Sequence, residues 1–202
     1  MKLILLSTPF CFVEEHQILN ALFDEGLELL HLRKPDSPAA YLERLITLIN
    51  EPYRKQIVIH DHFYLKAEYG LKGIHLNRRN PQPPSDYKGS ISLSCHSAEE
   101  VVQSKRKFDY LFLSPIFNSI SKQGYASHFP PEQLRELSKK KVIDRKVMAL
   151  GGVCADNIAS LREYGFGGAV VLGDVWNRFE QHSAQDFKEV LQQFRKLRKL
   201  AD

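Results

Sequence analysis

The chain has 202 residues, 43% of them hydrophobic, and a formal net charge of +4. This length suits one domain, because two domains of equal size would each approach the lower limit for a stable core. No stretch has the low hydrophobicity and high charge of a disordered segment, and no apolar run reaches the roughly 20 residues of a membrane span. We therefore expect one domain over residues 1–202, with no membrane partner.

The positive charge does not predict nucleic-acid binding. Its clearest local source is the helical pattern at 183–200, where the basic residues form the solvated face beside an apolar stripe: Arg195, Lys196, Arg198 and Lys199. No basic segment alternates with exposed aromatic residues, as nucleic-acid-binding surfaces do. We expect small-molecule partners and no nucleic-acid partner, and we leave a homodimer open.

The cysteines and the N-terminal segment favour a cytoplasmic protein. Cys11, Cys95 and Cys154 are odd in number and form neither a CxxC pair nor a zinc pattern, which suits a reducing compartment. The apolar run at 3–6 is soon followed by polar residues and Pro9, without a small-residue cleavage site. It therefore predicts a buried strand rather than a signal peptide.

Short apolar runs alternate with helical patterns along the whole chain. The runs predict strands at 2–7, 28–33, 56–61, 73–77, 90–95, 109–114, 146–152 and 168–173, most of them apolar on both faces, as buried parallel strands are. Helical patterns occupy 14–25, 38–49, 97–106, 131–141, 155–164 and 183–200, and a short helical turn fits 62–71. Gly26, Gly70 and Gly165 stand where helix C-caps are expected.

Eight strands that alternate with helices predict an α/β fold, a single (β/α)8 TIM barrel. An open doubly wound sheet is the alternative, but a dinucleotide-binding sheet is expected to carry a Gly-x-Gly-x-x-Gly turn after its first strand, and this sequence has none there. About 200 residues is the lower size limit for a barrel, so most loops must be short. The loops at 77–89 and 115–130 are long, which favours a functional role or disorder.

Polar residues follow the strands, whereas positions inside the strands are almost wholly apolar. The C-terminal ends of barrel strands line the active site in barrel enzymes. These residues therefore predict a site at that face: Ser7, Thr8, His31, Arg33, His60, Asp61, His75, Asn77, Ser94, His96, Ser114, Gly151, Gly152, Gly173 and Asp174.

Two loops of this face have the composition of a phosphate site. Ser119, Ser121 and Lys122 place two hydroxyls and a positive charge within four residues of one long loop. Gly152 and Gly173 end the last two strands, where glycine lets an anion approach backbone N–H groups and where barrel enzymes often bind phosphate. We therefore expect this rim to bind a phosphorylated small molecule.

The same positions carry six motifs in a characteristic order. They are His31-Leu-Arg33-Lys34-Pro35, His60-Asp61, Gly73-Ile-His75, Ser92-Leu-Ser94-Cys95-His96, the loop Ser114-Pro-Ile-Phe-Asn-Ser119-Ile-Ser121-Lys122, and Gly152 with Leu172-Gly173. In order and spacing they resemble the thiamine phosphate synthase and thiazole tautomerase family over nearly the whole chain. The resemblance implies that the thiazole phosphate is bound by Ser94, Ser119, Ser121, Gly152, Leu172 and Gly173.

The departures from the family pattern lie mainly on the diphosphate side. His31 and His60 stand where the family has Gln and Asn side chains that contact the pyrimidine substrate. Pro35 replaces a lysine of the diphosphate motif, whereas Arg33 and Lys122 match the family's cations. From this resemblance we expect His31, Arg33, His60 and Lys122 to be the catalytic residues.

The resemblance also implies Mg²⁺ as a cofactor. Asp61 matches one metal ligand, but a second metal aspartate of the family is here the neutral Asn80. A hard dication prefers anionic oxygen, so we expect a weakened Mg²⁺ site. The neighbouring Lys34 could replace the missing lysine in part, although on a strand it faces the opposite side.

For the activity, the resemblance implies a thiamine phosphate synthase that joins hydroxymethylpyrimidine diphosphate to thiazole phosphate and releases diphosphate. In such an enzyme Arg33, Lys122 and Mg²⁺ at Asp61 would neutralise the leaving group. No nucleophilic side chain is needed.

Two alternatives stay open. A thiazole tautomerase would aromatise the thiazole carboxylate phosphate with a histidine as acid and base. Pro115 stands where the relatives have that histidine, so His31, His60 or His96 would have to act instead. The third hypothesis is a paralogue that only binds thiamine intermediates.

Overall fold

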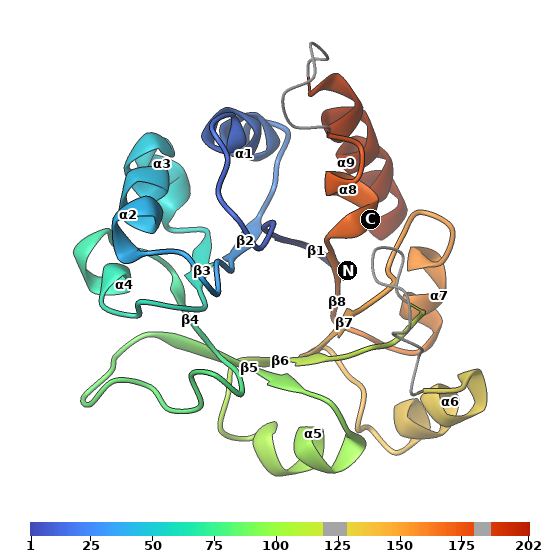
Figure 1. Cartoon of the computed structure of the whole chain (residues 1–202). Coiled ribbons are helices and arrows are strands. Elements are labelled where there is room, and N and C mark those ends of the chain that lie inside the picture. Colours follow the sequence, from blue (N-terminus) through green and yellow to red (C-terminus); the bar gives the residue numbers. More distant parts are fainter. Residues whose placement is uncertain (119–128, 180–186) are drawn as a thin grey trace.

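Eight parallel strands pair in chain order, and the last pairs with the first to close a ring (Figure 1). The computed structural model describes residues 1–118, 129–179 and 187–202. The strands are β1 (Lys2–Leu6), β2 (Leu29–Leu32), β3 (Ile57–Ile59), β4 (Gly73–Leu76), β5 (Ser90–Cys95), β6 (Tyr110–Leu113), β7 (Val147–Leu150) and β8 (Gly168–Val171). Each lies within a predicted run, so the predicted (β/α)8 barrel is confirmed.

Helices surround the ring on its outer side (Figure 1). The longer ones are α1 (Glu15–Asp24), α2 (Ala39–Leu48), α5 (Ala98–Ser104), α6 (Pro131–Lys139), α7 (Ile158–Glu163) and α9 (Lys188–Ala201). All lie within predicted helical segments, except that α9 extends one residue past the predicted end at 200. The short ones are α3 (Glu51–Arg54), α4 (Leu65–Glu68) and α8 (Gly173–Trp176), of which the sequence predicted only α4. None of the helices in the described residues is long and apolar enough to cross a membrane.

Glycine stands just after the ends of three helices, as predicted. Gly26, Gly70 and Gly165 have φ angles of 88°, 64° and 79°. This left-handed conformation costs a side-chain-bearing residue free energy, which explains glycine at these C-caps. The short connections that result bring each chain segment back into the ring.

Alternating side chains divide the strands into an outer and an inner layer. The outer layer packs against the helices in the main hydrophobic core. A separate apolar cluster fills the barrel itself and consists of Ile4, Leu6, Leu29, Val58, Tyr110, Phe112, Met148 and Val170. Where one strand contributes two of them, as with Ile4 and Leu6 or Tyr110 and Phe112, they are two apart, as inward-facing positions must be.

The barrel interior also contains polar residues beside this apolar cluster. His31, His60, His75 and Ser92 are all buried, and they fall at inward positions of β2 to β5 or directly after them. One sector of the interior is therefore polar. It lies below the C-terminal ends of the strands, where the candidate site was expected.

Candidate active site

Three imidazoles lie together in this polar sector: His31 and His60 are joined by a hydrogen bond, and His75 stacks on His60. His31 Nδ1 lies 2.9 Å from His60 Nε2, and His31 Nε2 lies 2.7 Å from the Tyr110 hydroxyl. The His60 and His75 rings stack with their centroids 4.2 Å apart. His75 in turn shares hydrogen bonds of 2.8 Å with the hydroxyls of Ser92 and Ser94.

Burial keeps these imidazoles neutral. It is the largest cause that lowers the pKa of His31 and His60 well below 6.5 and that of His75 to about 3. Positive charge on neighbouring groups, including Arg33 beside His75, lowers these pKa values further. A neutral imidazole offers one donor and one acceptor, so each ring can hydrogen-bond to its neighbours without carrying charge.

One ring nitrogen from each of His31, His60 and His75 lies within 4.8 Å of the other two, which is close enough for a shared metal ion. Both nitrogens of His31 and both of His75 already have hydrogen-bond partners. Among the described residues, no fully buried polar side-chain atom lacks such a partner. The contacts therefore describe a satisfied polar network rather than a set of free metal ligands.

Charged side chains lie next to these imidazoles, at the ends of β2 and β3. Arg33 is half-buried, and its backbone N–H donates to the Ser7 hydroxyl at 2.9 Å. Asp61 is 7% exposed. Burial and the positive charge of Arg79 lower the pKa of Arg33, whereas the negative charges of Asp61 and Asp36 raise it, so these four side chains act on one another.

Arg79 and Asn80 bind the Asp61 carboxylate from the loop after β4. The Arg79 guanidinium donates to Asp61 Oδ1 at 3.0 Å, and the Asn80 amide donates to the same oxygen at 3.0 Å. Asn80 also donates to the His60 carbonyl at 2.9 Å. The sequence analysis singled out Asn80 but missed Arg79. The only signal for Arg79 in the sequence is its position next to Asn80.

Ser94 and His96 lie on the rim at the end of β5. A hollow of about 230 Å³ is lined by both of them and by Asn77. His96 Nδ1 lies 3.1 Å from the Ser114 carbonyl oxygen. Because a carbonyl oxygen only accepts, Nδ1 is the donor in this contact, and the Ser114 hydroxyl lies 3.3 Å from the same nitrogen.

The glycine loop after β7 packs directly against the loop after β6. Gly152 has φ +65°, and a Cβ atom there would lie 2.2 Å from the Asn118 carbonyl oxygen. The Phe117 N–H donates to the Gly151 carbonyl at 3.0 Å. A close backbone approach thus accounts for glycine here, a reason different from the anion contact that the sequence suggested.

Leu172 and Gly173 close the rim on its other side. Leu172 is partly buried against both hydrophobic clusters, and Gly173 begins the four-residue helix α8. Asp174 joins this loop to the one after β7, because its Oδ2 accepts from the Ala155 N–H at 3.0 Å. Their role in binding stays a prediction. Ser119, Ser121 and Lys122 lie outside the described residues.

Lys34 faces away from the site, as its strand position predicted. It is fully buried and donates to Glu15 at 2.5 and 2.7 Å, to the Thr8 hydroxyl at 3.0 Å and to the Phe10 carbonyl at 2.7 Å. This ion pair ties the loop after β1 to β2. Lys34 therefore supplies no charge to the rim.

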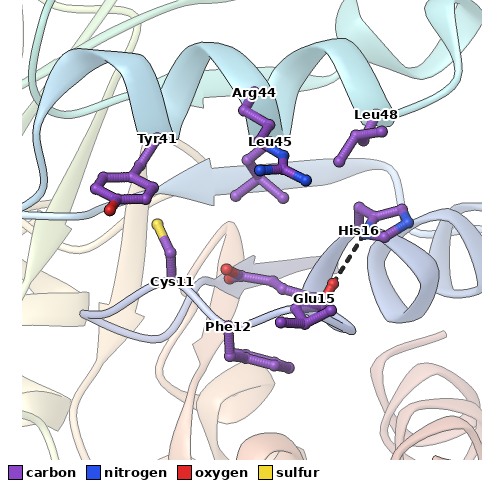
Figure 2. Close-up of a pocket in the computed structure, with 9 residues that line it drawn as sticks. Cys11, Phe12, Glu15, His16, Tyr41, Arg44, Leu45 and Leu48 are labelled. Carbon is purple, nitrogen blue, oxygen red and sulfur yellow. Dashed lines mark hydrogen bonds between the residues drawn. The ribbon is translucent and has the colours of Figure 1, made fainter.

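A pocket between α1 and α2 contains none of the predicted site residues. Figure 2 shows Cys11, Glu15 and His16 on one side of it and residues of α2 on the other, among them Tyr41 and Arg44. The Glu15 carboxylate there is the partner of Lys34. The described candidate residues lie instead at the C-terminal ends of the strands.

The closed barrel and the polar C-terminal ends of its strands define a class, the (β/α)8-barrel proteins that act on small molecules at that face. Within this class, the family model described as Thiamine monophosphate synthase matches residues 6–175. The chain therefore belongs to the thiamine monophosphate synthase family.

Individual relatives agree with this assignment. The crystal structure of thiamine phosphate pyrophosphorylase from Bacteroides thetaiotaomicron is 55% identical, has a TM-score of 0.93, and the match covers 100% of this chain and 98% of that one. Thiamine phosphate pyrophosphorylase from Pyrococcus furiosus is 19% identical with a TM-score of 0.73, over 99% and 95% of the two chains, and so shares the fold.

Curated relatives match over a shorter stretch. Thiamine-phosphate synthase of Actinobacillus succinogenes is 27% identical over 144 residues, which are 68% of this chain and 63% of that protein. The match thus spans less than two thirds of that relative's length.

The family typically uses Mg²⁺, and the residues around Asp61 do not suit this ion. Mg²⁺ requires oxygen ligands in near-octahedral geometry. Asp61 Oδ1 already accepts from Arg79 and Asn80, and Asn80 turns its NH₂ group, not its oxygen, toward the carboxylate. The weakened Mg²⁺ site stays a prediction, and these contacts give a physical reason for it.

Proposed function

We propose that this chain is a thiamine phosphate synthase, which couples hydroxymethylpyrimidine diphosphate to thiazole phosphate. The observation that carries the proposal is the position of Arg33, Asp61, His60 and Ser94 at the C-terminal ends of β2, β3 and β5, in a barrel of this family. Its relatives by name are thiamine-phosphate synthases, and the family implies phosphorylated small molecules as substrates.

In the reaction, the thiazole nitrogen forms a bond to the methylene carbon of the pyrimidine. The bond between that carbon and the diphosphate oxygen breaks, and diphosphate leaves with the electron pair. Arg33 neutralises the charge that develops on the leaving oxygen. Lys122, Ser119 and Ser121 join the anion site in this proposal, on the basis of their family motif alone.

His31 and His60 take the place of the family's amides in pyrimidine binding. A neutral imidazole and a carboxamide both present a donor and an acceptor, so His60 can replace the amide at the pyrimidine edge. His31 is fully buried beneath it, with both nitrogens engaged. We therefore assign His31 a positioning role that acts through His60.

Thiazole phosphate binds on the opposite side of the rim, at Ser94, Gly152, Leu172 and Gly173. Ser94 is oriented by its 2.8 Å hydrogen bond with His75. Gly152 holds the loops after β6 and β7 at their observed separation. The oligomeric state, including a homodimer, plays no part in this assignment.

The experiment is direct. The purified protein is incubated with both substrates, and thiamine phosphate is measured by mass spectrometry. We expect thiamine phosphate from the wild-type protein. Absence of product under all metal conditions, with the protein folded, would contradict the synthase assignment.

One observation favours thiazole tautomerase as a second candidate. The contact between His96 Nδ1 and the Ser114 carbonyl orients this ring at the rim, where its Nε2 would serve as the acid and base. Aromatisation of the thiazole carboxylate phosphate by the wild type, lost in His96→Gln and unaccompanied by synthase activity, would support it. Binding of thiazole phosphate without either activity would support the third hypothesis, a paralogue that only binds thiamine intermediates.

A further inference from the structure

The Arg79 guanidinium lies beside the Asp61 carboxylate, where the resemblance places a Mg²⁺ ion. Arg79 Nη2 is 3.0 Å from Asp61 Oδ1 and 3.4 Å from Oδ2, so it contacts both carboxylate oxygens. The Asp61 side chain is 10% exposed, whereas that of Arg79 is 40% exposed. One face of the guanidinium group is therefore held by the protein while the remainder is open to solvent.

The loop after β4 fixes this position. Asn77 Oδ1 accepts the backbone N–H groups of Arg79 at 2.9 Å and Asn80 at 3.3 Å, and the Asn77 N–H donates to the Asn80 carbonyl at 3.1 Å. This arrangement is a side-chain-stabilised turn. It holds two donors over Asp61, one cationic and one neutral.

The charged groups that act on one another at this corner of the rim are the guanidinium groups of Arg33 and Arg79 and the carboxylates of Asp61 and Asp36. Guanidinium groups stay charged in proteins and bind phosphate oxygens through two parallel hydrogen bonds. Two of them near one another can therefore neutralise a diphosphate in the way that a metal ion does in other phosphate sites.

We propose that Arg79, held by Asp61 and acting with Arg33, binds the diphosphate group of the substrate directly, so that this chain binds diphosphate without Mg²⁺. The inference rests on the proposed function, because it assumes that the diphosphate enters between these residues. It assigns to Arg79 a binding role that the family motif does not contain.

The test measures inorganic diphosphate binding by isothermal titration calorimetry, in EDTA and in excess Mg²⁺. Wild-type protein is expected to bind in EDTA. Arg79→Ala should weaken this binding by about 10- to 100-fold, the effect of losing a charge-assisted hydrogen bond to a phosphate. The matched control is Arg106→Ala, which removes an exposed arginine in the segment before β6, at the other end of the barrel, and should leave the affinity within about twofold.

A second variant tests the link with the metal. Arg79→Ala combined with Asn80→Asp frees Asp61 and adds a carboxylate beside it, so its diphosphate binding should depend on Mg²⁺. Direct titration of Mg²⁺ into this double variant, without diphosphate, gives a readout that is independent of catalysis.

Three results would overturn the inference. They are diphosphate binding by the wild type only in Mg²⁺, no binding by the wild type in either buffer, and unchanged affinity of Arg79→Ala in EDTA. Failure of the synthase assignment looks different, since diphosphate would bind through Arg79 in EDTA while no thiamine phosphate forms.

Discussion

His31 Nδ1 and His60 Nε2 lie 2.9 Å apart inside the barrel, in a hydrogen bond that requires at least one of the two rings to be neutral. Both side chains are almost completely buried. A protonated His31 would have to leave this contact or share a buried charge with no carboxylate among its hydrogen-bond partners. The interior of this barrel is therefore sensitive to acid.

Stability should fall as the pH drops through the imidazole range. The folded-state pKa values of His31, His60 and His75 are lowered, so below about pH 6.5 the unfolded chain binds more protons than the folded one. Each such histidine lowers the free energy of unfolding by about 1.4 kcal/mol per pH unit on acidification. Above that pH its contribution is constant.

Urea unfolding at several pH values checks this expectation. The double variant His31→Gln/His60→Asn, which carries the family's residues, should show a shallower dependence between about pH 5 and 6.5. His16→Gln, a substitution on α1 outside the site, is the control and should keep the wild-type slope. Equal slopes in all three proteins would contradict the buried-imidazole account.

The buried Lys34–Glu15 pair should matter strongly for stability. Both side chains are 0% exposed, and removing one partner of a buried pair leaves an uncompensated charge, which costs about 3–5 kcal/mol. Lys34→Met should lower the free energy of unfolding accordingly, and Lys34→Met/Glu15→Leu should recover much of the loss. Urea unfolding measures both.

The exposed Lys140–Glu136 pair on α6 provides the comparison. Its side chains are 65% and 60% exposed, so Lys140→Met should have a far smaller effect, because solvent screens the interaction. If Lys34→Met and Lys140→Met destabilise the protein equally, the buried pair does not hold the loop after β1.

Gly152 and Gly70 allow a matched test of close packing at the rim. Their φ angles are +65° and +64°, but a Cβ at Gly152 would lie 2.2 Å from the Asn118 oxygen, whereas one at Gly70 would meet no atom within 4 Å. Both alanine variants pay about 1–2 kcal/mol for the left-handed backbone. Only Gly152→Ala must also displace the neighbouring loop.

We therefore expect Gly152→Ala to be less stable than Gly70→Ala and to lose thiazole phosphate affinity. Thermal unfolding and calorimetric titration with thiazole phosphate measure the two effects. A normal affinity in Gly152→Ala would remove the loop contact from the account of the phosphate site.

Arg33 should be required for catalysis if it stabilises the leaving diphosphate. Arg33→Ala is expected to lower the rate of thiamine phosphate formation by about 10²–10³, the usual effect of removing one such group. Arg106→Ala is the control, because Arg106 is exposed in the segment that precedes β6, at the other end of the barrel. Rates that fall equally in both variants would point to a general loss of folded protein.

Much of the fold could be predicted because buried parallel strands and helix-ending glycines leave local signals. The apolar run at 2–7 and the glycine at position 26 are examples, and both were found in the expected roles. Asp61 and Ser94 could be placed at one rim because the carboxyl ends of barrel strands face the same side.

The contacts inside the site depend on pairings that no local pattern encodes. The meeting of His31 with His60 and Tyr110 requires the inter-strand register, in which His31 lies opposite Val58. The contact of Arg79 with Asp61 depends on the turn that Asn77 stabilises. Strand alternation predicted that Lys34 faces away from the site, but nothing local in the sequence identified Glu15 as its partner.

The release of diphosphate tests the synthase assignment most directly. A continuous diphosphate assay compares wild-type protein given both substrates with the same protein given hydroxymethylpyrimidine diphosphate alone, and mass spectrometry measures thiamine phosphate in parallel. We predict diphosphate release only when both substrates are present, in equal amount to the thiamine phosphate formed. Release from the pyrimidine substrate alone, or no release with both substrates present, would contradict the account.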